Sequence, residues 1–424
     1  MSSNAQRARN AADAPGSFRN PQAALSARSW ARAPILALTR KGDRMVHNMP
    51  PCKIVTALVL ASAFGPVLCS AQPANENKPL RLAIAGLVHG HVDGFFKALE
   101  KRPDVQLVGI FDPDKALQHH YAQQYKFPDS LFFTDLGVML DQSKPEAVAA
   151  FSSTLDHPVI VQAAAKRHID VMMEKPLAVS VAQAEIIQSA ASQSGIQVIV
   201  NYETTWYKSH AAIWQLVKQQ HALGDLNRIV AMDGHQGPKE IGVGPEFLSW
   251  LTDPAKNGAG ALYDFGCYGA NLMTWLMDNQ RPIAVTALLQ TVKPQIYPNV
   301  DDQATVLIQY ARAQGVIQAS WNWPFSRKDL EVYGQTGYAI ATGYAIATGG
   351  DALRVRLSKQ AQEQLQELAP LPPDEADSIS YLKAVVRGKL KPAGLSSLEN
   401  NMIVTAILAA ASESAKTGQT VQLH

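Results

Sequence analysis

The chain has 424 residues, 47% of them hydrophobic and 17% charged, and its formal net charge at pH 7 is +2. This composition is that of a folded protein with one large or two ordinary domains, and it argues against extensive disorder away from the ends. No long run of Lys and Arg is interleaved with aromatic residues, which excludes nucleic-acid binding as the main role. We therefore expect a small, uncharged partner.

The first part of the chain has the layout of an export signal. Residues 1–51 are rich in Ala, Arg, Ser and Asn, and Lys53 is then followed by the apolar run 54–68 and by Cys69-Ser70-Ala71. Such a layout is typical of a secretory signal peptide, here with cleavage after Ala71, and the run is too short for a membrane span. We expect a leader over 1–71, no membrane span and a periplasmic mature protein.

Cysteine usage limits the chemistry of the mature chain. Cys52 and Cys69 lie in the leader, so Cys267 is the one cysteine that remains. A single cysteine excludes an internal disulfide and the metal sites built from several cysteines.

Strands and helices alternate from residue 79 to residue 200. This period predicts a doubly wound parallel sheet, a Rossmann dinucleotide-binding domain in an α/β protein. The expected strands are at 80–86, 105–111, 146–151, 169–173 and 196–200, and helices are expected at 158–166 and 181–194.

The first strand arrives at a glycine turn that opens a helix. In a dinucleotide-binding unit, the amides of such a turn hold the pyrophosphate. Gly86 fits the first glycine position, but Val88 and His91 stand where the second and third glycines are expected, and Gly90 compensates in part. We assign Gly86, Val88, His89, Gly90 and His91 to cofactor binding. His89 and His91 also suggest a metal, but two histidines in a nucleotide-binding turn without an acidic partner make one unlikely, so we expect none.

Asp112 follows the second strand, about 20 residues beyond the turn, which is the position of the acid that binds the adenosine ribose. It favours NAD, whereas Lys115 keeps NADP open. Asp112 can also be read as a turn residue before a helix, because Asp-Pro commonly opens turns.

The strand at 169–173 ends in Glu174-Lys175-Pro176. The carboxyl ends of parallel strands meet at the crevice where open α/β sheets keep their ligands. Lys175 is therefore a candidate for proton donation, for lowering the pKa of a neighbour or for a phosphate contact.

The second half, residues 201–424, has a different pattern. Consecutive strands without long helices predict an α+β substrate domain with an open, mostly antiparallel sheet. We expect a homo-oligomer through this sheet, with Trp321 and Trp323 on one strand face. The hexapeptide at 337–342 is repeated at 343–348. The expected strands are at 284–289, 304–310, 315–323 and 329–334, and helices are expected at 212–220, 380–388 and 398–414.

A glycine-rich run at 258–276 carries Asp264, Tyr268 and Asn271, spaced four and three residues apart. If this run is helical, the three side chains share one face. All three are then substrate candidates.

The lysine motif, the Gly-Ala-Gly-Ala-Leu-Tyr-Asp-Phe-Gly run and the nucleotide-binding half together resemble the glucose-fructose oxidoreductase, inositol dehydrogenase and MocA (Gfo/Idh/MocA) family. The resemblance implies an NAD(P)-dependent oxidoreductase acting on a sugar or polyol. It places Lys175 and His157 beside the nicotinamide, with Glu174 in the cofactor site, and makes Lys175, Asp264 and Tyr268 catalytic. Tyr268 stands where many members of the family have histidine. In this it is similar to the glucose-fructose oxidoreductase branch, which has tyrosine at that position.

For alcohol oxidation, Tyr268 is our candidate base. Its pKa must then fall from about 10 to near neutrality, which takes roughly 4 kcal/mol. One ammonium at ~4 Å, with an effective dielectric near 20, supplies about that much, so Lys175 is sufficient if the two groups meet. Asp264 would orient the pair or bind a substrate hydroxyl.

Two other functions remain open from the sequence. One is a glycosidase that oxidises its sugar transiently and returns the hydride, and the other is a binding protein that has lost catalysis. Export adds a further expectation: because free NAD is scarce outside the cytoplasm, the cofactor should be held tightly.

Overall fold

The computed structural model describes residues 78–343 and 351–423. The predicted leader, the signal peptide and its cleavage point lie outside the described residues, as does most of the second hexapeptide copy. The first copy forms strand β12, Gly337–Thr342.

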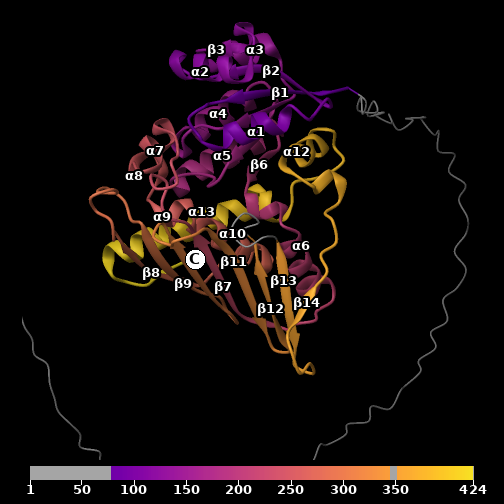
Figure 1. Ribbon diagram of the computed structural model, residues 1–424, viewed down its shortest axis with the longest axis vertical. Helices are drawn as coiled ribbons and strands as arrows, with labels where there is room; N and C mark the ends of the chain where they lie inside the picture. Colours follow the sequence, from indigo (N-terminus) through magenta and orange to yellow (C-terminus); the bar gives the residue numbers. More distant parts are fainter. Residues whose placement is uncertain (1–77, 344–350, 424) are drawn as a thin grey trace, which may run out of the picture. The chain divides into compact units, whose positions relative to one another are not determined.

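The first sheet is parallel throughout, with strand order β3-β2-β1-β4-β5-β6. Figure 1 labels β1, β2, β3 and β6 of this sheet. The order reverses between β1 and β4, which places the ligand crevice of such a sheet beside the carboxyl end of β1. The predicted Rossmann domain is confirmed. Its strands are β1 Leu80–Ala85, β2 Val105–Phe111, β3 Phe132–Phe133, β4 Ala147–Ala150, β5 Asp170–Glu174 and β6 Val198–Asn201.

The helix α5 between these strands has capping residues at both ends. The Ser180 side chain accepts the Gln183 amide at the start of α5, and Gly195 ends that helix with a positive φ of 74°. A hydroxyl at the N-cap and a glycine just past the end are the usual signals for both termini. The helices are α1 His91–Leu99, α2 Lys115–Tyr125, α3 Leu136–Ser143, α4 His157–Ala165 and α5 Val181–Ser194.

The second sheet has nine strands in the order β14-β13-β12-β11-β7-β10-β9-β8-β15. Its pairings are antiparallel except for that between β7 and β10, so the predicted open, mostly antiparallel sheet is also confirmed. In addition to β12, its strands are β7 Leu226–Gly234, β8 Ala284–Gln290, β9 Gln303–Gln309, β10 Gln314–Ser320, β11 Arg327–Gly334, β13 Ala352–Leu357, β14 Gln364–Gln366 and β15 Val421–Gln422.

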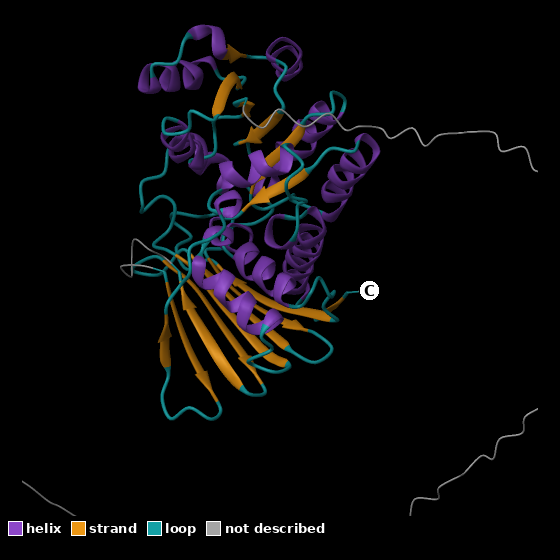
Figure 2. Cartoon of the chain, turned by 90° about the vertical axis from the view of Figure 1, so that its right-hand side faces the viewer, coloured by secondary structure: helices purple, strands orange, loops and turns teal. Residues whose placement is uncertain are grey.

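Helices gather toward one side of this sheet (Figure 2), with α10 against β7 and β10 and α13 against β8. Leu288 on β8 and Leu307 on β9 are exposed. The helices of this half are α6 Lys208–Trp214, α7 Pro245–Leu251, α8 Pro254–Asn257, α9 Ala261–Asp264, α10 Gly266–Leu276, α12 Ser378–Val386 and α13 Leu398–Thr417.

One helix of the second half packs on the first sheet. Ile379, Leu382 and Val385 of α12 share a hydrophobic cluster with Leu82 and Ile84 of β1. The core of the Rossmann half therefore includes residues that follow its first strand by about three hundred positions in the chain.

Candidate functional site

A buried ion pair joins the two halves of the molecule. The ammonium of Lys175, at the end of β5, donates to the Asp264 carboxylate Oδ1 at 2.5 Å and to the Asp264 backbone carbonyl at 2.9 Å. The side chains are 6% and 8% exposed. The indole of Trp321 donates to the second carboxylate oxygen at 2.9 Å, so both oxygens of Asp264 are held.

The pair remains ionised because each charge is compensated. Burial alone lowers the pKa of Lys175, but the Asp264 carboxylate reverses this, and the net pKa lies above its ordinary value. Burial likewise raises the pKa of Asp264, and the Lys175 ammonium then brings it below its usual range. Charge-assisted hydrogen bonds of this kind are the strong ones.

Tyr268 lies beside this pair, but its phenol is not acidified. Burial raises its pKa well above the ordinary value, with nearby acids including Glu203 adding to the effect. The expected fall of the Tyr268 pKa is therefore wrong for this state of the molecule. The Lys175 ammonium lies 5.1 Å from the centre of the phenol ring, and its charge is already balanced by Asp264.

A second ammonium lies closer to the same ring, and sequence reasoning missed it. Nζ of Lys328, on β11, is 4.4 Å from the Tyr268 ring centre and forms an ion pair with Glu203. Cations over aromatic faces are attracted by the ring quadrupole. No local sequence pattern predicts this contact, because it depends on β11 pairing with β7.

His235 is another group that the sequence analysis did not identify. Its Nδ1 accepts the Gly237 amide at 2.9 Å, which leaves the proton of the neutral ring on Nε2. Burial lowers the pKa of His235 to about 4, so the ring is neutral near pH 7. It can therefore donate a hydrogen bond to a ligand oxygen.

Asn271 does not belong to this group, contrary to the shared-face expectation. The helix is interrupted at Phe265, between α9 and α10, so Asp264 and Asn271 do not lie on one continuous helix. The Asn271 amide donates instead to the Leu395 carbonyl at 2.8 Å. Trp321 also departs from its expected role: β10 ends at Ser320, and Trp321 is fully buried against Asp264 rather than on a strand face.

The catalytic candidates line one cavity of about 520 Å³. It extends from the first turn of α1 to the ion pair, and its lining includes Gly90, His91, Lys175, Asp264, Tyr268 and Lys328. Acid, base and hydrogen-bonding groups thus converge on a space in which a polyhydroxylated ligand can meet several of them.

The glycine turn at the end of β1 is closed on itself. The Leu87 amide donates to Asp112, the His89 amide to the Phe151 carbonyl, and the His91 amide to Nδ1 of His89. Gly86 is required here, since its φ is +90° and a Cβ would lie 2.8 Å from the Ser152 backbone. These amides are already used, whereas a phosphate-binding turn presents free ones.

Asp112 contributes to this closure. It is 1% exposed, and its two carboxylate oxygens accept the amides of Leu87 at 2.7 Å and Asp114 at 2.9 Å. Burial raises its pKa despite these bonds. In this structure the carboxylate ties the turn to β2.

The remaining cofactor candidates lie near the crevice. His157 is buried, with Nδ1 bonded to the Leu177 carbonyl at 3.0 Å and Nε2 without a partner. Glu174 accepts from Asn201 and contacts His91. The backbone of Val88 accepts the Trp250 indole at 3.2 Å, and the Phe247 ring lies 4.7 Å from that of His89, so α7 covers the turn.

These residues fit a nicotinamide at the Lys175 end of the site. A charged pair lines the cavity there. The buried Nε2 of His157 has no hydrogen-bond partner, but His157 is not among the residues that line this cavity. The diphosphate end offers fewer free amides than a glycine turn usually does.

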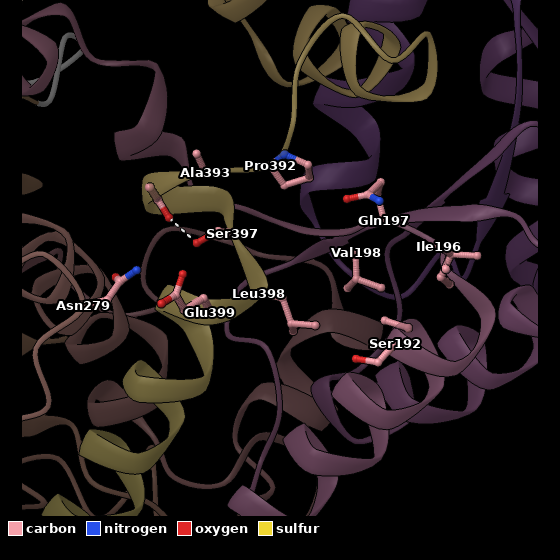
Figure 3. Close-up of a pocket in the computed structure, with 13 residues that line it drawn as sticks. Ser192, Ile196, Gln197, Val198, Asn279, Pro392, Ala393, Ser397, Leu398 and Glu399 are labelled. Carbon is pink, nitrogen blue, oxygen red and sulfur yellow. Dashed lines mark hydrogen bonds between the residues drawn. The ribbon is translucent and has the colours of Figure 1, made fainter. Parts of the chain in front are cut away.

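A second cavity, of about 550 Å³, is chemically plain (Figure 3). It lies between the end of α5, β6 and the segment that leads into α13, and Glu399 is the one charged residue among its thirteen lining residues. We therefore assign the chemistry to the cavity at Lys175. Within the described residues, no helix is long and apolar enough to cross a membrane.

Comparison with known proteins identifies both halves. Residues 80–202 match the model of the oxidoreductase family with an NAD-binding Rossmann fold, and residues 210–340 match the Gfo/Idh/MocA C-terminal domain. The trans-1,2-dihydrobenzene-1,2-diol dehydrogenase of Xenopus tropicalis is 25% identical over 53% of this chain and 64% of its own length. The match thus spans less than two thirds of that relative.

Solved structures share the fold. The aldose-aldose oxidoreductase from Caulobacter crescentus has a TM-score of 0.70 and 21% identity, covering 82% of this chain and 100% of its own. An inositol dehydrogenase homolog from Azotobacter vinelandii, complexed with NAD+, has a TM-score of 0.70 and 18% identity, covering 82% of this chain and 98% of its own. Because the two family models together match more than half of the chain, the chain belongs to the Gfo/Idh/MocA family of NAD-binding oxidoreductases.

Proposed function

We propose that this chain transfers hydride between a nicotinamide cofactor and a hydroxyl or carbonyl group of a sugar or polyol. The buried Lys175–Asp264 pair carries this proposal, because it fixes an ammonium at the base of a cavity that Tyr268 and Lys328 also line. The nicotinamide ring supplies hydride chemistry when bound. Glu174, Lys175 and His157 are the residues proposed to hold it.

The chain's own groups handle the substrate oxygen and its proton. Lys175 orients the oxygen while Asp264 holds the ammonium in place. Because burial raises the pKa of Tyr268, its phenol is neutral and can donate a hydrogen bond to the substrate oxygen.

We propose NAD rather than NADP as the cofactor. The Asp112 carboxylate lies at the end of β2, and its negative charge disfavours a second phosphate on the adenosine ribose. Lys115, two residues after Pro113, is the feature that favours NADP. Comparing rates with the two nucleotides decides between them.

We further propose export to the periplasm and self-association through the open sheet. Export depends on the signal-like segment at 53–71, and tight retention of the cofactor would accompany it. Self-association is supported by Leu288 and Leu307, which are 69% and 51% exposed on neighbouring strands.

The test is nicotinamide absorbance in the purified protein with a panel of aldoses, ketoses and polyols. Net reduction or oxidation of the nucleotide by one member supports the proposal. Cleavage of a glycoside without net absorbance change would indicate the redox-neutral glycosidase instead. Failure to bind any nicotinamide nucleotide would indicate a binding protein that has lost catalysis.

A further inference from the structure

Three metal-binding side chains converge beside the cavity. Each of His89, His91 and Glu174 offers a ligand atom, and these atoms all lie within 4.8 Å of one another. Nδ1 of His91 is 2.9 Å from a Glu174 oxygen, and the two imidazole centres are 4.5 Å apart. We propose that these three residues bind a divalent transition-metal cation of the Zn²⁺ class.

In the folded chain, Glu174 is the acidic partner of the two histidines. The absence of an acid near the two histidines was the reason for expecting no metal. The parallel sheet brings the end of β5 beside the first turn of α1, so Glu174 lies next to His91 although the chain separates them by 83 positions. Two imidazoles and one carboxylate are an established ligand set for zinc and related cations.

Glu174 is a buried carboxylate in contact with one of the two histidines. The side chain is 2% exposed, and it is bonded to the His91 ring and to the Asn201 amide. Buried charges in proteins are paired or coordinate metals, and a divalent cation here would add to the compensation that these groups supply.

The surroundings also hold the ligands in position. Asn201 donates to Glu174 Oε1 at 2.9 Å, and Asn201 in turn accepts the Trp206 indole at 3.1 Å. Partners of this kind orient the ligands of metal sites.

Metal binding replaces two existing hydrogen bonds. Nδ1 of His89 accepts a long one, 3.2 Å, from the His91 amide, and Nδ1 of His91 is bonded to Glu174 at 2.9 Å. The His91 side chain is 46% exposed, so its ring has room to turn toward the metal.

Solvent reaches the site at His91, whereas His89 and Glu174 are buried. His91 lines the cavity at Lys175 and also a third cavity, of about 730 Å³, which Glu174 lines as well. Three protein ligands leave coordination positions that water or a ligand oxygen can fill, as in catalytic zinc sites. The inference does not rest on the proposed redox function, but Glu174 is common to the metal cluster and the proposed nicotinamide site, so metal and nucleotide should compete for it.

The experiment uses the purified chain without a polyhistidine tag, stripped with a chelator and titrated with ZnCl₂ by calorimetry. We expect about one zinc per chain with micromolar or tighter affinity. His91→Ala and Glu174→Gln should each weaken binding at least about tenfold. His120→Ala, which changes a histidine of the same cavity outside the cluster, should bind as the unmodified chain does.

X-ray absorption of the zinc-loaded protein should show imidazole nitrogen and carboxylate oxygen at about 2.0–2.2 Å. Absence of binding at millimolar zinc, or binding that neither substitution weakens, overturns the proposal. So does equal weakening by His120→Ala. His91→Ala decides the matter if Glu174→Gln does not fold, because His91 is half-exposed. No nucleotide or sugar is present, so this failure is distinct from failure of the proposed function.

Discussion

The carboxyl ends of β5 and β1 belong to the same sheet, with β4 between them, yet they are built differently. The end of β5 reaches outward, since Lys175 binds Asp264 in the second half of the molecule. The end of β1 is closed, because the amides of Leu87, His89 and His91 bond to groups of the first half. The difference shows that, within one sheet, the end of one strand can bond across to the second half of the molecule while the end of another bonds only within the first half.

A direct contact still links the two strand ends. His91 follows β1 and Glu174 ends β5, and their side chains meet at 2.9 Å. A change at either end therefore acts on a shared pair, which allows the two regions to be compared by matched substitutions.

The largest effect is expected from Lys175→Ala. It removes the ammonium that the proposed chemistry needs, so turnover should fall at least about a hundredfold. It also leaves Asp264 buried without its partner, which should cost roughly 3–5 kcal/mol of the free energy of unfolding. Steady-state rates and urea unfolding measure the two quantities, with Lys166→Ala on the exposed end of α4 as the control. Near-normal turnover in a folded Lys175→Ala protein would dismiss the assignment.

Trp321→Phe tests the support behind the same end of β5. The substitution keeps the buried ring but removes the N–H that bonds Asp264, and a hydrogen bond to a charged group is worth about 1.5–3 kcal/mol. We expect roughly a tenfold loss of turnover if the carboxylate must be held in place. Trp323→Phe is the matched control, because that indole does not contact Asp264 in the structure. Equal effects of the two substitutions would show that Asp264 does not depend on Trp321.

Asp112→Asn tests the closed end at β1. An amide cannot accept at both positions where the carboxylate now accepts backbone N–H groups, so unfolding should become easier by about 1–3 kcal/mol. Asp114→Asn is the control, since Asp114 caps α2 and Asn caps a helix equally well. An Asp112→Asn protein as stable as the control would mean that the turn is open in solution.

The smallest expected effect is the pH dependence of the stability that the Lys175–Asp264 ion pair contributes. The folded pKa of Asp264 is lowered, so its stabilising contribution is full above its unfolded value of about 4 and is lost as the pH falls further. The folded pKa of Lys175 is raised, so its contribution is full below about 10.4 and is lost as the pH rises through the folded value.

The difference in unfolding free energy between the unmodified chain and Lys175→Met/Asp264→Asn should therefore stay constant from about pH 5 to 9. Urea unfolding across this range measures it. A slope within the range would mean that a group outside the pair controls the difference.

The sequence was sufficient for the architecture because both sheets follow from local periodicity. Alternating strands and helices predicted the parallel sheet, and consecutive strands predicted the antiparallel one; for α5 even the bounds agree. The meeting of Lys175 and Asp264 followed from the family resemblance, since no local pattern relates residues 89 positions apart.

What the sequence could not give depends on tertiary contacts. Lys328 lies beside Tyr268 because β11 pairs with β7. Trp321 bonds Asp264 from a position just past the end of β10, which ends at Ser320. The pKa of Tyr268 was predicted with the wrong sign, because burial and nearby acids outweigh an ammonium that Asp264 already neutralises. Glu174 became a partner of His91 through the parallel pairing of the sheet.

Transfer of deuterium from substrate to nucleotide tests the central claim most directly. A sugar that gives turnover in the absorbance screen is labelled at its ring carbons and incubated with NAD, and the nucleotide mass is measured. The account predicts that the unmodified chain forms reduced nucleotide one mass unit heavier than the NADH obtained with the unlabelled sugar, and that Lys175→Ala forms none. No gain with any labelled sugar, or the same gain in Lys175→Ala, would contradict it.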